Sequence, residues 1–86
     1  MNNFKFRLIT SEPQNGFMNM AIDEAIAIAC DKHRSPPTLR LYSWNPPCIS
    51  IGYFQDANEV IDISECRRQS IDIVRRLTGG KAVLHN

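Results

Sequence analysis

The residue types best suited to chemistry stand at the end of the chain, where residues 75–86 read RRLTGGKAVLHN. The adjacent glycines at 79 and 80 let backbone amides approach a ligand closely, because no Cβ stands in the way. Successive amides in such a turn form a concave nest that attracts anions. Arg75, Arg76 and Lys81 add positive charge on both sides of the turn. The pattern predicts a loop that holds a carboxylate or phosphate, although a glycine pair is also a common hairpin connector.

Other residues that could take part in chemistry can also be explained by a purely structural role. His85 could hydrogen-bond a phosphate or orient a loop, but no neighbour in the sequence marks it as a general base. The carboxylates of Asp23 and Glu24 would point about 100° apart on a helix, which favours a structural role over an acid–base pair. Trp44 stands before a proline corner, and either an apolar pocket or the core suits its bulk.

The chain has three cysteines, an odd number, and their positions at 30, 48 and 66 do not fit CxxC spacing. A disulfide framework and a zinc site are therefore not expected, and no other metal site is predicted. None of the three is adjacent to a histidine or at a clear helix start, so none is predicted to be a nucleophile. Reduced thiols favour a cytoplasmic location, and the N-terminal residues lack the apolar run of a signal peptide.

Composition excludes two classes of partner. The 86 residues carry a net charge of +1 and are 43% hydrophobic and 22% charged. This balance gives no electrostatic reason to expect binding to nucleic acid or to a membrane surface. Residues 17–30 form the longest weakly polar stretch, which is too short to span a bilayer.

The periodicity of apolar residues predicts strands alternating with helices, a fold of the α+β or α/β class. Strands are expected over 4–9, 38–44, 48–54, 71–76 and 82–84, and helices over 17–33 and 60–70. Asn15 is the expected N-cap of the first helix. The third strand is expected to pair antiparallel with the second across the Asn45-Pro46-Pro47 corner. The last strand has no partner or cover after it, so we expect the front part of a larger domain.

Four segments together resemble the lipoate–protein ligase A and octanoyltransferase superfamily, also called biotin/lipoate A/B protein ligases. They read FMNMAIDEA at 17–25, TLRLYSWNPP at 38–47, SIGYFQ at 50–55 and RRLTGGKAVLH at 75–85. The resemblance implies a mixed, largely antiparallel sheet with flanking helices. It also implies that residues 1–86 are the N-terminal portion of a single catalytic domain.

The resemblance further implies that the loop wraps a lipoyl or octanoyl group and, in ligases, its adenylate. The residues it assigns to this acyl or acyl-adenylate site are Trp44, Arg75, Thr78, Gly79, Gly80, Lys81, Ala82 and His85. Lys81 stands where ligases usually have a third glycine, which is more similar to the octanoyltransferase branch. Asn86 stands where the family usually has aspartate, so that residue's usual role is in doubt.

The implied activity is attachment of lipoyl or octanoyl groups to lysines of lipoyl domains. Lipoate or octanoate is then a substrate, ATP and Mg²⁺ serve only a ligase, and no cofactor is bound covalently. The implied partners are lipoyl domains of 2-oxoacid dehydrogenases or the glycine cleavage H protein, with acyl carrier protein for a transferase. The family's catalytic lysine and the transferase cysteine lie beyond residue 86, so no catalytic residue is assigned and these residues alone are expected to be inactive. The alternative is a noncatalytic module that binds lipoate or lipoyl-AMP, or that regulates.

Overall fold

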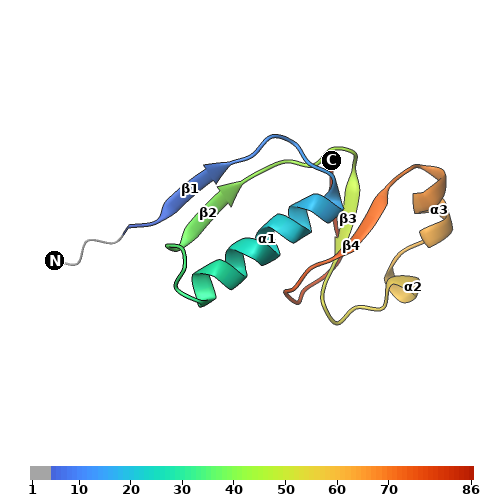
Figure 1. Ribbon diagram of the computed structural model, residues 1–86. Coiled ribbons are helices and arrows are strands. Elements are labelled where there is room, and N and C mark those ends of the chain that lie inside the picture. Colours follow the sequence, from blue (N-terminus) through green and yellow to red (C-terminus); the bar gives the residue numbers. More distant parts are fainter. Residues whose placement is uncertain (1–4) are drawn as a thin grey trace.

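The computed structural model describes residues 5–86, in which five strands and three helices follow one another. Figure 1 shows the long first helix beside two separate groups of strands. The elements are β1 (Arg7–Thr10), α1 (Gly16–Asp31), β2 (Thr38–Leu41), β3 (Cys48–Ile51), α2 (Ala57–Val60), α3 (Ile63–Arg68), β4 (Asp72–Arg75) and β5 (Val83–His85). The predicted order of elements is confirmed. Phe4, predicted to begin the first strand, lies outside the described residues.

The strands form two sheets, and each sheet contains a parallel pair joined through helical structure. Strand β1 pairs with β2, and α1 connects them. Strand β3 lies between β4, to which it is parallel, and β5, to which it is antiparallel. A mixed sheet with flanking helices is therefore confirmed. The expected antiparallel majority is not observed, because two of the three ladders in the described range are parallel.

The predicted antiparallel pairing of the second and third strands is wrong, because β2 and β3 belong to different sheets. After β2, the chain stays bound to the loop before α1: the Asn45 amide donates to the Gln14 carbonyl at 2.9 Å, and the Gln14 amide donates to the Ser43 carbonyl at 3.4 Å. Two prolines follow at once and supply no backbone donor. The corner therefore carries the chain from one sheet to the other.

Helix boundaries follow local capping. The Asn15 side chain accepts a hydrogen bond from the Met18 amide at 2.8 Å, which confirms the predicted N-cap of α1. The predicted second helix is divided into α2 and α3, because Asp62 accepts from the Glu65 amide at 3.0 Å and caps a new helix. The predicted helix over 60–70 passes through Asp62 without a break, whereas an aspartate side chain favours a helix start.

A buried polar network holds α1 against β2. The amide nitrogen of Asn19, which is fully buried, donates to the Ser43 carbonyl at 3.1 Å, and its oxygen accepts from Arg40 at 2.8 Å. Asp23 accepts from Arg40 at 3.0 Å and from the Tyr42 hydroxyl at 2.6 Å. Burial and the Asp23 hydrogen bond raise the pKa of Tyr42 to about 12, so this hydroxyl stays protonated and donates. The structural role expected for Asp23 is confirmed.

The apolar core is small and lies on β3, β4 and α3. Its buried hydrophobic members are Cys48, Ile51, Cys66 and Val74. Large apolar side chains elsewhere are exposed, with Phe17 at 60% and Phe54 at 88%. The radius of gyration is 15.1 Å, whereas a compact domain of this length has one of about 12 Å. These residues therefore leave much apolar surface uncovered. Within the described range, no helix is long and apolar enough to cross a membrane.

Candidate functional site

A cavity of about 370 Å³, within the size range of small-molecule sites, lies between α1, the end of β2, strand β3 and the segment after β4. One side of its wall is mainly apolar and aromatic, and two arginines and a histidine contribute polar groups. The lining residues are Met20, Asp23, Glu24, Ala27, Tyr42, Trp44, Ser50, Arg75, Arg76, Leu77, Thr78 and His85.

The structure brings four of the predicted site residues together in this cavity: Trp44, Arg75, Thr78 and His85. They come from β5, the end of β4 and the segments that follow β2 and β4. The next three predicted residues, 79–81, continue the loop from Thr78 and are exposed. The predicted acyl-binding loop thus contributes its first half to the cavity wall and its glycines to the neighbouring surface.

The glycine loop is shaped by contact with the turn after β3. Gly80 has a φ of 103°, which favours glycine, and a Cβ on Gly52 would overlap the carbonyl oxygen of Gly80. The Tyr53 amide donates to the Thr78 carbonyl at 2.9 Å and ties the two segments together. Neither Gly79 nor Gly80 donates its own amide to another residue of the range 5–86. Those two donors are available to an anionic group.

Both arginines bind backbone carbonyl groups, which the sequence pattern did not anticipate. Nη1 of Arg75 donates to the carbonyls of Tyr53 at 2.9 Å and Gln55 at 2.6 Å. Arg76 donates through Nη2 to the carbonyl of Gly79 at 3.1 Å and to that of Lys81 at 2.8 Å. The arginine pair therefore fastens the loops that border the cavity, in addition to supplying positive charge.

An aromatic stack closes one side of the cavity. The rings of Trp44 and His85 lie 4.0 Å apart between centroids at an interplanar angle of 16°, and Tyr42 lies 5.6 Å from Trp44. His85 also shares a hydrogen bond of 2.8 Å between its Nε2 and the Ser50 hydroxyl. Burial, together with the nearby Arg76 charge, lowers the pKa of His85 below its usual value. The imidazole is thus neutral at pH 7 and held flat against the indole.

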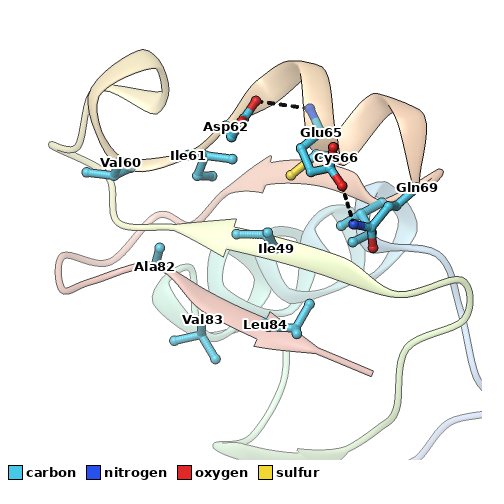
Figure 2. Close-up of a pocket in the computed structure, with 11 residues that line it drawn as sticks. Ile49, Val60, Ile61, Asp62, Glu65, Cys66, Gln69, Ala82, Val83 and Leu84 are labelled. Atoms are coloured by element: carbon cyan, nitrogen blue, oxygen red, sulfur yellow. Dashed lines mark hydrogen bonds between the residues drawn. The ribbon is translucent and has the colours of Figure 1, made fainter.

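Ala82, the remaining predicted site residue, lies on the other side of the sheet. It lines a groove of about 340 Å³, a volume typical of a small-molecule site, together with Ile49, Val83 and Leu84. Figure 2 shows these side chains below α3, with Glu65 and Gln69 on the helix above. Successive residues of a strand point to opposite faces, so Ile49 faces this groove and Ser50 faces the cavity. The structure does not bring Ala82 into the cavity.

Several cavity residues were not singled out from the sequence. Met20 and Ala27 recur at helical spacing on α1, so a helical projection could have grouped them with Glu24. Ser50 carried no such signal, because a serine in an apolar strand is common. Its importance follows only from the contacts it makes with Arg76 and His85.

The part of the chain that the structure describes holds no cluster that could bind a metal ion, and the thiol of Cys48 is not poised as a nucleophile. No group of three or more His, Cys, Asp or Glu side chains that could hold a metal ion occurs among residues 5–86. Burial, and then the charge of Asp72, raises the pKa of Cys48 to about 11. This thiol is therefore protonated at neutral pH and closed to solvent.

Comparison with known proteins places the chain in a family. The family model of the lipoyl protein ligase A/B catalytic domain matches residues 15–86. Among curated relatives, "Octanoyltransferase LipM" of Clostridioides difficile is 52% identical over 82 residues, which is 95% of this chain and 30% of that protein. The chain therefore spans about a third of the length of the relatives it matches.

Solved structures agree in fold. A Thermoplasma acidophilum protein with bound lipoic acid has a TM-score of 0.79 and 38% identity, over 96% of this chain and 34% of that one. A lipoate-protein ligase A bound with ATP has a TM-score of 0.81 and 35% identity, over 96% and 33%. A bipartite lipoate protein ligase, described with its E2 lipoyl domain from T. acidophilum, has a TM-score of 0.82 and 36% identity, over 98% and 32%. The chain belongs to the lipoyl protein ligase A/B catalytic domain family.

Proposed function

We propose that this chain is part of an enzyme that attaches octanoyl or lipoyl groups to lysines of lipoyl domains, and that its cavity holds the acyl group. The observation that carries the proposal is one cavity in which an apolar, aromatic wall meets Thr78, the residue that leads directly into the exposed Gly79-Gly80 pair. An acyl chain suits the wall formed by Tyr42, Trp44 and Leu77. The polar head of the acyl group suits the free amides of Gly79 and Gly80.

Octanoyl transfer is the version of this function that we favour. The sequence relatives that match most of the chain at 45–52% identity are named octanoyltransferases. Lys81 in place of a third glycine supports the same branch. The solved structures, in contrast, are lipoate ligases, one of which holds ATP. In the ligase version, ATP and Mg²⁺ would activate lipoate before transfer, and neither version needs a covalently bound cofactor.

The proposed site consists of the cavity residues Trp44, Arg75, Thr78 and His85, with Gly79, Gly80 and Lys81 at its polar end. Residues 1–86 would form the N-terminal portion of a single catalytic domain, which is consistent with the extent of uncovered apolar surface. The acceptor proteins would be lipoyl domains of 2-oxoacid dehydrogenases or the glycine cleavage H protein, and acyl carrier protein would be the donor for a transferase. A cytoplasmic location is supported by three free cysteines.

The proposal is tested first by binding of octanoate. Trp44 is the only tryptophan in the chain and lines the cavity, so its fluorescence reports the titration directly. We expect saturable binding of octanoate and lipoate, and much weaker binding of butyrate, because each buried methylene contributes about 0.8 kcal/mol.

A matched pair of leucines provides the control. Leu77 lines the cavity and Leu84 lines the opposite groove, and they are similarly exposed, at 60% and 55%. Leu77→Ser should weaken octanoate binding about tenfold, which corresponds to about 1.4 kcal/mol. Leu84→Ser should leave it unchanged. Equal effects of the two substitutions, or no saturable binding, would contradict an acyl site in this cavity.

Turnover separates an enzyme from a binding module. Octanoyl transfer from octanoyl carrier protein to a lipoyl domain, compared with ATP-dependent lipoate attachment, distinguishes transferase from ligase. The isolated 86 residues are expected to bind acyl groups without turnover. Turnover by these residues alone would overturn the expectation that the reaction needs groups outside them.

A further inference from the structure

One polar chain connects the glycine loop to the aromatic stack of the cavity. Nη1 of Arg76 lies 2.8 Å from the hydroxyl oxygen of Ser50, and that oxygen lies 2.8 Å from Nε2 of His85. Ser50 is fully buried in the middle of β3, and Arg76 also donates to its backbone carbonyl at 3.0 Å. Ser50 therefore has a fixed position between a guanidinium group and the imidazole.

The chemistry of the three groups fixes the direction of both hydrogen bonds. A guanidinium group has donors only, so the Ser50 oxygen must accept from Arg76. The single hydroxyl proton of Ser50 is then left for Nε2 of His85, which must be unprotonated to accept it. A protonated Nε2 would leave this buried hydroxyl proton without an acceptor among the described residues. His85 must accordingly be neutral, with its proton on Nδ1.

The stack with Trp44 fixes the plane of the same ring. A centroid separation of 4.0 Å and an angle of 16° keep the imidazole flat on the indole, and the Ser50 bond sets its rotation within that plane. The Nδ1–H group makes no hydrogen bond to another residue in the range 5–86. The ring therefore has one nitrogen fully engaged and one donor unused, in a cavity lined by both His85 and Trp44.

We propose that Ser50 is a positioning residue of the acyl site: its hydroxyl group fixes the tautomer and orientation of His85, so that Nδ1–H serves as a hydrogen-bond donor to an oxygen of the bound acyl group. Ser50 itself does not touch the acyl group, and it acts through His85. The functional part of this inference rests on the proposed acyl-binding function. The tautomer and orientation rest on geometry alone.

The surroundings of His85 set the expected pH behaviour. The charged or titratable groups that share the cavity with it, or face it across the β3–β5 ladder, are Arg75, Arg76, Asp23, Glu24, Tyr42 and Cys48. Asp23 is bound to Arg40 and Tyr42, and the thiol of Cys48 is protonated at neutral pH. Burial of the ring, and then the charge of Arg76, lowers the pKa of His85 and favours its neutral form, as the Ser50 hydrogen bond does.

The tautomer is measured by long-range ¹H–¹⁵N NMR correlation of the histidine rings in the full chain. We expect His85 in the Nδ1–H form at pH 7, with exposed His33 as an internal reference. Ser50→Ala removes one oxygen, and it should move most of the population to the Nε2–H form and raise the pKa of His85 towards its usual value. Ser64→Ala on α3, where the side chain is exposed, should change neither.

The wild-type spectrum alone decides whether the geometry is right, even if Ser50→Ala does not fold. An Nε2–H form in the wild-type protein would overturn the proposal, as would an unchanged tautomer in folded Ser50→Ala. Ser50→Thr keeps a hydroxyl group and should restore the Nδ1–H form.

Octanoate titration tests the functional part separately. Ser50→Ala should weaken octanoate binding about fivefold while Ser64→Ala does not. Equal affinities of wild type and Ser50→Ala would overturn the link between His85 and the acyl group. Absence of octanoate binding by the wild-type protein would instead contradict the proposed function, and the tautomer measurement would still decide the role of Ser50.

Discussion

Substitution of Gly52 by alanine tests how the glycine loop is held in place. A Cβ at Gly52 would overlap the Gly80 carbonyl oxygen and would lie 2.9 Å from its carbonyl carbon, inside the 3.0 Å limit that real Cβ atoms keep. Both partners are backbone, so neither can rotate away as a flexible side chain would. The two loops must therefore separate, which strains the Tyr53–Thr78 hydrogen bond of 2.9 Å.

The expected cost follows from overpacking and from the weakened hydrogen bond. Forcing a methyl group into a filled site costs about 1–3 kcal/mol, and a weakened backbone hydrogen bond costs up to about 1 kcal/mol. We expect Gly52→Ala to lower the free energy of unfolding by about 2 kcal/mol, which is about a 30-fold change in the folded-to-unfolded ratio. Octanoate binding should weaken as well, because the displaced loop borders the cavity.

Gly79→Ala, in the glycine loop that faces Gly52, provides the control. A Cβ at Gly79 meets nothing within 4 Å, and its φ is not in the left-handed region. Alanine there should be neutral or stabilise by up to about 1 kcal/mol, because the unfolded chain loses freedom. Urea denaturation followed by Trp44 fluorescence measures both variants. Equal stability of Gly52→Ala and Gly79→Ala would refute the packing argument.

Three further predictions concern the rest of the described structure. Asn19→Ala should lower the free energy of unfolding by about 2–4 kcal/mol in urea denaturation, because Arg40 and the Ser43 carbonyl each lose a hydrogen-bond partner inside the protein. A loss below about 0.5 kcal/mol would contradict the stabilising role of the polar network between α1 and β2. The lowered pKa of His85 means that the unfolded state, in which the histidine has its usual pKa of about 6.5, binds more protons than the folded state. Stability should therefore fall as the pH drops from about 6.5 towards the folded-state pKa. In His85→Gln, thermal melts over that pH range should lose this part of the dependence, and an unchanged slope would contradict the assignment. At pH 8, iodoacetamide should modify partly exposed Cys30 well before buried Cys48 and Cys66, and mass spectrometry showing Cys48 modified first would contradict the burial and raised pKa of that thiol.

Local chemistry in the sequence was sufficient to predict many elements of the fold. The side-chain oxygen of Asn15 caps the helix that follows it in the sequence, and the alternation of apolar residues located each strand to within a few residues. The predicted pairing of β2 with β3 was wrong, because strand pairing depends on contacts between residues far apart in the sequence. Here the loop before α1 competes with β3, and its hydrogen bonds at Gln14 hold the chain after β2.

The site shows the same division between local and distant information. The residue types of the glycine loop and Trp44 could be recognised from the sequence and from its resemblance to a family. The bond from Ser50 to His85 could not, because 35 residues separate them and only the β3–β5 ladder brings them together. The position of Ala82 depends on which face of the sheet its segment meets, and the sequence of the loop does not specify that face.

The central claim is that the acyl group binds between Trp44 and the glycine loop, and NMR mapping with octanoate tests it most directly. We expect shifts that saturate together at the Trp44 indole, the Thr78 and Gly79 amides and the His85 ring. Ile49 and Leu84, which line the opposite groove, should not respond. Shifts confined to that groove, or no saturable shifts at the cavity, would contradict the account.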